Sequence, residues 1–187
     1  MSISEVSSTI RHCAQSINDA VAQHGADCSE LLTALKAPVT RLIQHDNLAE
    51  YGAPRPGNNV AMSQYLYFDG QLSILLFEVP TSQPVPPHDH GIWEGFGIYR
   101  GRVRHQVYRR VDDMSVDGYA ELECKRDEVL CAGDVTLIAP PDDIHSFIAL
   151  DPSTMGLTIT FGPYKEKRHY YQPDNNSYVV KSQNNRR

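Results

Sequence analysis

Two histidines separated by one residue are the strongest chemical signal in this sequence. The stretch 86–94 reads Pro-Pro-His-Asp-His-Gly-Ile-Trp-Glu and contains His88, His90 and Glu94. Residues two apart on a β-strand point to the same face, so the imidazoles of His88 and His90 can reach one point, and Glu94 keeps the same parity. Imidazole and carboxylate groups are ligands for divalent transition metals. The spacing therefore predicts a chelating site.

A third candidate ligand, His145, follows a turn in the stretch 133–145, at the expected start of another strand. A neighbouring antiparallel strand could bring it to the same centre. With 8 His in 187 residues, chance gives a His-x-His pair about 0.3 times. Requiring Glu94 and then Gly101, seven residues further on, lowers that expectation to roughly 0.001. Chance is a poor explanation of the pattern.

The first fifty residues are expected to be helical. Ser2 and Glu5 could form a capping box, and Gly25 suits the end of the first helix. A second helix is predicted from Ser29, ending at Pro38, with a further turn or two after it. The apolar stripe of the first helix has spacings of three and four and consists of Val6, Ile10, Cys13, Ile17 and Val21.

From about residue 51 the pattern changes to short strand-like runs. They are separated by turns such as Asp-Gly and contain no helix long enough for a parallel crossover, which predicts an antiparallel sandwich or small barrel. We expect a helical segment at 1–50 packed on a barrel at 51–172, and a polar tail at 173–187 that is frayed or draped over the surface. The predicted strands are 65–68, 72–79, 95–99, 103–108, 120–124, 135–139, 145–150 and 157–161.

Composition excludes several classes of protein. Lys plus Arg is 17 and Asp plus Glu is 23, giving a net charge of −6, so no nucleic-acid or anionic-membrane partner is expected. At 41% hydrophobic residues the chain is not disordered, and its apolar runs are too short for a membrane span. Four Cys without a CxxC pair and an N-terminus unlike a signal peptide favour a cytoplasmic protein. A monomer and a homodimer both remain open.

The pattern His-x-His-x3-Glu-x6-Gly resembles the first cupin motif, and the stretch 133–145 resembles the second, whose His completes the site. The resemblance covers roughly residues 65–161. It implies a mainly β fold, the double-stranded β-helix of the cupins, which is a jelly-roll-like barrel. Here the N-terminal α-helices would pack on this barrel. The resemblance also implies one divalent metal on His88, His90, Glu94 and His145. Ser82, Asp142 and Ala149 depart from the usual motif residues, and the second motif is one residue longer.

Among cupins, the Pro-His-Asp-His-Gly-x-Trp stretch looks most like the thiol dioxygenases, the cysteine dioxygenase and 3-mercaptopropionate dioxygenase group. That resemblance implies Fe(II) on three His, with a small thiol and O₂ as partners. The chain differs from the group in three ways. It keeps Glu94, it has Leu-Thr-Ile-Thr-Phe at 157–161 in place of a Ser-x-His-x-Tyr strand, and it lacks the substrate-binding Arg near 62–65.

The site chemistry leaves the reaction open. Iron is expected from the resemblance, while Mn, Ni and Zn suit the same ligands. Glu94 could be a fourth ligand, a catalytic acid or base, or a carboxylate that orients a histidine. Side chains expected to wall a substrate pocket are Tyr65, Trp93, Phe96 and Tyr164.

Three functions follow from this chemistry. The first is a mononuclear non-haem iron oxygenase that oxidises a small organic substrate with O₂. The second is a non-redox cupin isomerase or lyase that uses Mn, Ni or Zn as a Lewis acid. The third is a binding module without turnover. The other histidines, His12, His24, His45, His105 and His169, are expected to have no functional role. The Arg-rich stretch 100–110 is expected to be a solvated face balanced by Asp112, Asp113 and Glu128 rather than a basic groove for an acidic ligand.

Overall fold

The structure is a computed structural model that describes residues 3–25, 28–55, 63–163 and 165–182. Two helices come first and strands follow, as predicted. The helices are α1 (Ile3–His24), α2 (Cys28–Ile43), η1 (Leu48–Glu50) and η2 (Pro173–Asn175). The strands are β1 (Ala53–Pro54), β2 (Ser63–Phe68), β3 (Leu72–Glu78), β4 (Val85–His88), β5 (Glu94–Arg100), β6 (Arg102–Arg110), β7 (Leu122–Cys131), β8 (Val135–Ile138), β9 (Ile144–Ala149), β10 (Met155–Phe161), β11 (Lys167–Gln172) and β12 (Ser177–Ser182).

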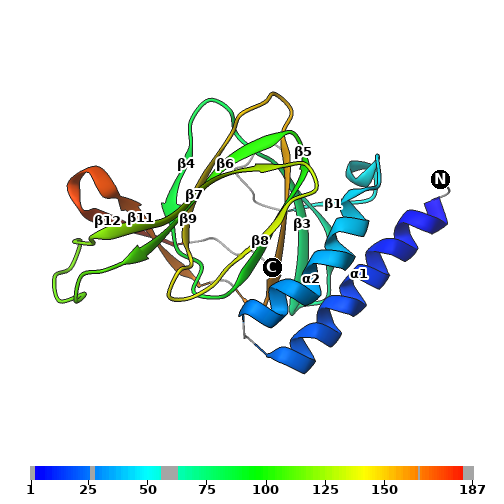
Figure 1. Cartoon of the computed structure of the whole chain (residues 1–187), viewed down its shortest axis with the longest axis horizontal. Helices are drawn as coiled ribbons and strands as arrows, with labels where there is room; N and C mark the ends of the chain where they lie inside the picture. The colour runs from blue at the N-terminus through cyan, green and yellow to red at the C-terminus, as the bar shows by residue number, and fades with distance from the viewer. Residues whose placement is uncertain (1–2, 26–27, 56–62, 164, 183–187) are drawn as a thin grey trace.

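The described strands form two antiparallel sheets that face each other (Figure 1). The first sheet has the order β1-β2-β3-β10-β5-β8, and the second has the order β12-β11-β4-β9-β6-β7. Strands distant in sequence are therefore neighbours in both sheets. Between the sheets lies an apolar cluster that includes Phe77, Phe96 and Phe147. This is the cupin double-stranded β-helix, a mainly β fold, as the sequence motifs imply.

Helices α1 and α2 cover the outer face of the first sheet (Figure 1). Leu31 and Leu35 of α2 are fully buried and share a cluster with Leu157 and Ile159 of β10. Because this sheet is covered on both faces, β5 is buried from Glu94 to Tyr99. The helices thus cover the outer face of the first sheet, whose other face lines the interior.

The second helix does not end at Pro38, so that expectation is wrong. Pro38 lies inside α2, which continues to Ile43. Proline in a helix interior removes one backbone hydrogen bond. The stripe of Leu35, Val39 and Leu42 is fully buried on both sides of it, and this packing outweighs the local penalty.

Over its described part, 173–182, the polar tail forms η2 and β12. Asn176 adopts a left-handed conformation (φ 51°) that turns the chain after η2, and β12 then pairs with β11 along its whole length. The β-branched residues Val179 and Val180 favour a strand.

The eight predicted strands correspond to β2, β3 and β5–β10. The sequence prediction missed β4, β11 and β12.

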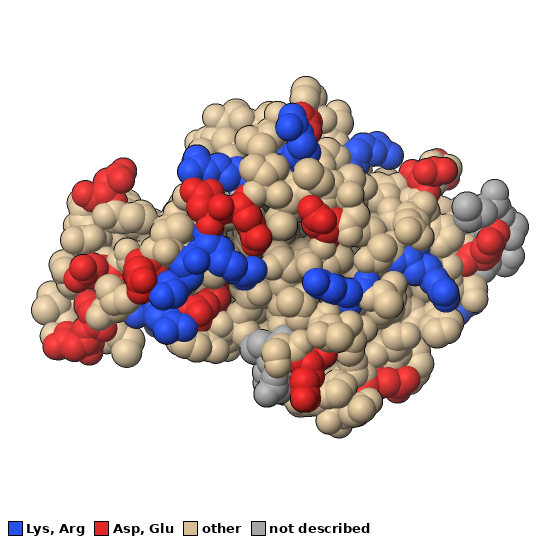
Figure 2. All heavy atoms as spheres, viewed as in Figure 1, with Lys and Arg blue, Asp and Glu red and all other residues tan. Residues whose placement is uncertain are grey.

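Charged residues of both signs are mixed on the face seen in Figure 2. The arginines of β6 are paired with acidic side chains, so their charges are balanced, but of the three expected partners only Asp112 pairs with an arginine of this strand, and that pair is largely buried. The ion pairs are Arg102–Asp151, Arg104–Asp127, Arg109–Asp142 and Arg110–Asp112. No helix in the described ranges is long and apolar enough to span a bilayer.

Candidate metal centre

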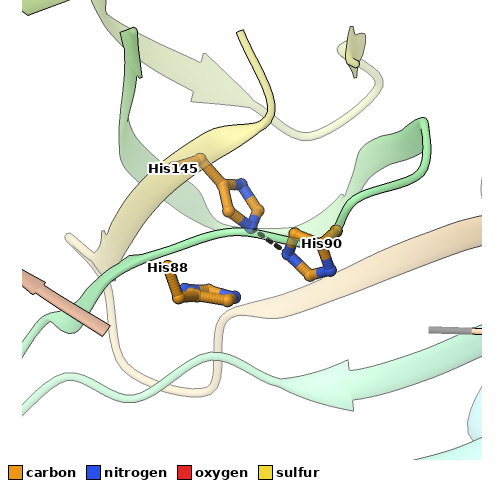
Figure 3. A group of neighbouring side chains, drawn as sticks. All are labelled: His88, His90 and His145. Atoms are coloured by element: carbon orange, nitrogen blue, oxygen red, sulfur yellow. Dashed lines mark hydrogen bonds between the residues drawn. The ribbon is translucent and has the colours of Figure 1, made fainter. Parts of the chain in front are cut away.

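The second sheet brings the three predicted histidine ligands together (Figure 3). His88 ends β4, His90 lies in the loop that follows, and His145 is the second residue of β9. The antiparallel register places His88 directly opposite His145. One nitrogen from each ring lies within 4.8 Å of the others. All three side chains are buried, with 0–5% of each residue exposed.

The spacing of these rings fits a shared cation. The Nε2 atoms of His90 and His145 are 2.9 Å apart. Two nitrogen ligands at about 2.1 Å from one metal, at a right angle, would lie about 3.0 Å apart. Nδ1 of His88 is 2.9 Å from the carbonyl oxygen of Pro86, and donating there leaves its Nε2 as the acceptor that can bind a metal. The donor set therefore fits one divalent transition metal.

Burial keeps these histidines neutral. It lowers the pKa of His88 to about 4, and it lowers the pKa of His90 and of His145 well below the ordinary value. The positive charge of Arg168 on β11, and that of a neighbouring histidine if it were protonated, would also lower the pKa of His90 and of His145. Near neutral pH each imidazole is in the form that binds a metal, with a lone pair available.

Glu94, the first residue of β5, lies beside two of the histidines and is almost completely buried. One carboxylate oxygen is 3.3 Å from Nδ1 of His90, and the other is 3.8 Å from Nε2 of His145. The group whose ligand atoms all approach one another consists, among the described residues, of the three histidines alone. Ligation by Glu94 stays a prediction, and its position also suits the orienting role toward His90.

The four predicted pocket residues lie in different places. Phe96 is fully buried, with its ring 6.1 Å from that of His145, edge to face. Trp93 points the other way and lines a pocket of about 540 Å³ with Val21 of α1 and Phe161 of β10. Tyr65 on β2 is half-buried against Phe68, with ring centroids 5.1 Å apart. Tyr164 lies outside the described residues, and the substrate-binding roles stay predictions.

His105 is a neighbour of the centre that the sequence analysis set aside. It lies on β6, is fully buried, and places its Nε2 3.0 Å from Nδ1 of His145. The ring of Phe96 stacks on it with centroids 5.2 Å apart. Nothing in its spacing signals this contact, because the contact depends on the register that pairs β6 with β9. Tyr170 of β11, also missed, stacks on His88 at 5.7 Å.

Two buried carboxylates hold the histidine loop in place. Asp143 accepts a hydrogen bond of 2.7 Å from the backbone N–H of Gly91, which joins the loop after His90 to the segment before His145. Asp89 accepts hydrogen bonds from the backbone and the ring of His169, each 2.8 Å long. Burial would raise the pKa of Asp89, but these hydrogen bonds and Lys165 outweigh burial and lower it. The loop is thus tied to β9 and to β11.

The sequence matches no protein-family model and no curated protein. Several solved structures are similar in fold. An RmlC-like cupin protein from Ralstonia eutropha is 20% identical, over 70% of this chain and 73% of that one, with a TM-score of 0.44. A hydroquinone 1,2-dioxygenase in complex with Cd²⁺ and 4-hydroxybenzonitrile is 13% identical over 53% of this chain, with a TM-score of 0.42, and the match spans 63% of that dioxygenase chain.

A ribosomal oxygenase from Escherichia coli, in complex with cobalt and 2-oxoglutarate, is 24% identical. The match covers 50% of this chain and 24% of the oxygenase, with a TM-score of 0.39. These likenesses concern the fold. By its strand order, its two facing sheets and its buried histidines, the chain has the cupin fold with a three-histidine group suited to one divalent metal.

Proposed function

We propose that this chain is a mononuclear non-haem iron oxygenase of the cupin type, which oxidises a small organic substrate with O₂ in the cytoplasm. The observation that carries the proposal is the group of three buried, neutral imidazoles that face one point. Three neutral ligands leave the charge of the cation uncompensated and leave coordination positions for other molecules. Bound Fe(II) would supply the one-electron chemistry that O₂ requires.

The chain itself would hold and shield this centre. Phe96 and Phe147 pack against His145, at 6.1 and 5.3 Å between ring centroids, and keep water from that side. Thr160 lies opposite Glu94 in the register of β10 and β5, so its buried hydroxyl is on the interior side of the sheet. Glu94 would orient His90 through its Nδ1 and could hold a proton at its carboxylate.

One observation favours a second candidate, a non-redox isomerase or lyase. The buried carboxylate of Glu94 lies 3.8 Å from Nε2 of His145, near enough to move a proton on a substrate bound at the centre. With Mn, Ni or Zn as a Lewis acid, the same residues would support proton transfer without O₂.

Oxygen uptake tests the proposal. The protein is loaded with Fe(II) without air and then mixed with O₂ and a panel of thiols, enediols and diketones. We expect uptake that requires both iron and one class of substrate, and we expect His88→Ala to abolish it. The matched control is His12→Ala, which removes an exposed histidine of α1. No uptake with any substrate would refute the oxygenase, and turnover under anaerobic conditions by zinc-loaded protein would establish the second candidate.

A further inference from the structure

We infer that His105 and Glu128 form a relay behind His145 that fixes which nitrogen of His145 carries its proton, and so makes His145 a metal ligand. The inference rests on the proposed metal centre and names two positioning residues in it. Neither residue would itself bind the metal. The chain of contacts runs from Glu128 on β7 through His105 on β6 to His145 on β9.

Strand register builds the relay. His105 lies directly opposite Glu128 in the pairing of β6 with β7, and opposite Phe147 in the pairing of β6 with β9. His145 is two residues before Phe147 and therefore shares its face. The Nε2 atom of His105 is 3.0 Å from Nδ1 of His145, and its Nδ1 is 3.7 Å from a carboxylate oxygen of Glu128.

The direction of the hydrogen bond decides whether His145 can bind a metal. A neutral imidazole carries one proton, and a ring that binds through Nε2 must carry it on Nδ1. Nδ1 of His145 must then donate to Nε2 of His105. The ring of His105 must in turn carry its own proton on Nδ1. The opposite arrangement, with His105 donating, would put the proton of neutral His145 on Nε2 and block that atom.

Glu128 selects the arrangement that allows binding. Its carboxylate lies 3.7 Å from Nδ1 of His105, too far for a hydrogen bond, and acts through its charge, which favours a proton on the facing Nδ1 over a lone pair there. Arg126 holds this carboxylate through a contact of 3.3 Å, and is itself fixed by hydrogen bonds of 2.8 Å to Thr136 and 3.0 Å to the carbonyl of Leu137. The stacked ring of Phe96 fixes the plane of His105. The direction of the hydrogen bond between His145 and His105 is thus set by groups nearer the surface.

Metal affinity measured without turnover tests the relay. We use competition between the protein and a chromophoric chelator for Zn²⁺. His105→Phe keeps an aromatic ring against Phe96 but removes the acceptor, and we expect affinity to fall about 10- to 100-fold. His105→Gln places an amide oxygen near the position of Nε2, and should recover at least half of that loss on a logarithmic scale. Glu128→Gln should give a smaller loss than His105→Phe.

The control is Arg104→Gln, which changes an exposed side chain on the outer face of the same strand and should leave affinity unchanged. Circular dichroism checks that each variant is folded. Unchanged affinity in a folded His105→Phe variant would overturn the relay while leaving the metal centre intact, whereas failure of the wild-type protein to bind any divalent metal would overturn both.

Nitrogen-15 NMR of the wild-type protein provides a second measurement, independent of whether His105→Phe folds. In the Zn²⁺-loaded protein we expect protons on Nδ1 of both His145 and His105. A proton on Nε2 of His105 would contradict the relay, whatever the affinities of the variants.

Discussion

At the scale of the residue, the contact between Glu94 and His90 bears on which nitrogen of His90 can bind a metal. The carboxylate lies 3.3 Å from Nδ1 of His90, while Nε2 of the same ring faces His145. A carboxylate in this position favours a proton on Nδ1 and makes Nε2 a better donor to a metal. His145 receives corresponding support from His105. With the carbonyl oxygen of Pro86 at Nδ1 of His88, each of the three histidines has a second polar group behind its ring.

Glu94→Gln tests whether this carboxylate supports the centre or is one of its essential ligands. Glutamine keeps an oxygen that can accept from Nδ1 of His90 but loses the charge, so Zn²⁺ affinity should fall by about tenfold. His88→Ala, which removes a ligand, should abolish tight binding. Chelator competition measures both. A loss for Glu94→Gln as severe as that for His88→Ala would show that Glu94 is itself an essential ligand.

The sequence predicts the three histidines because their spacing is a local property, although His90 lies in the loop after β4 and not, as expected, on the same strand as His88. His88 and His90 are two residues apart, and His145 begins a strand in a second recognisable stretch. His105 cannot be found in this way. Its contact with His145 joins residues 40 apart through the pairing of β6 with β9, and no local spacing reports that pairing.

At the scale of the element, the turn between β5 and β6 depends on Gly101. Its φ is +79°, and a Cβ at this position would lie 2.3 Å from Oγ1 and 3.2 Å from Cα of the buried Thr154. The glycine of the first motif is therefore required both by backbone conformation and by a close approach of another segment.

Gly101→Ala should lower the free energy of unfolding by about 3 kcal/mol, because strain and overpacking add. Gly118→Ala is the matched control. Gly118 has a similar φ of +78° with no atom within 4 Å of a Cβ, so only the conformational cost of about 1 kcal/mol applies. Urea denaturation measures both variants, and equal losses would show that the contact with Thr154 does not matter.

The elements that the sequence analysis missed share a physical cause. Strand β4 contains two prolines, and β11 and β12 are mostly polar, so none shows a clear alternation of apolar residues. Their positions are fixed by neighbours: Tyr170 of β11 pairs with His88 of β4. Strands β3 and β10 were predictable because they contain long runs of buried residues. These residues are mostly apolar, so the sequence alone indicates that they are buried.

At the scale of the whole molecule, the buried histidines couple folding to pH. Burial lowers the pKa of His88 to about 4 and that of His105 to about 3, while both regain the ordinary value of 6.5 on unfolding. The unfolded chain therefore binds more protons below pH 6.5. The stability that these groups contribute is fully present above this pH and is lost as the pH falls toward 4 and 3.

We expect the free energy of unfolding of the metal-free protein to fall between pH 6.5 and pH 4 by about 1.4 kcal/mol per pH unit for each buried histidine. Urea denaturation at several pH values measures this slope. His105→Gln should reduce the slope by one histidine. A slope of zero in this range would contradict neutral burial of the imidazoles.

The hydrogen bond from Gly91 to Asp143 joins the two arms of the chain that carry His90 and His145. Because this tether consists of protein atoms alone, we expect it to hold the two arms together without an ion. A chelator should therefore strip the cation while the polypeptide stays folded, and a fresh ion could return without any refolding. The speed of exchange would then depend on how quickly the incoming ion sheds its water shell inside the barrel.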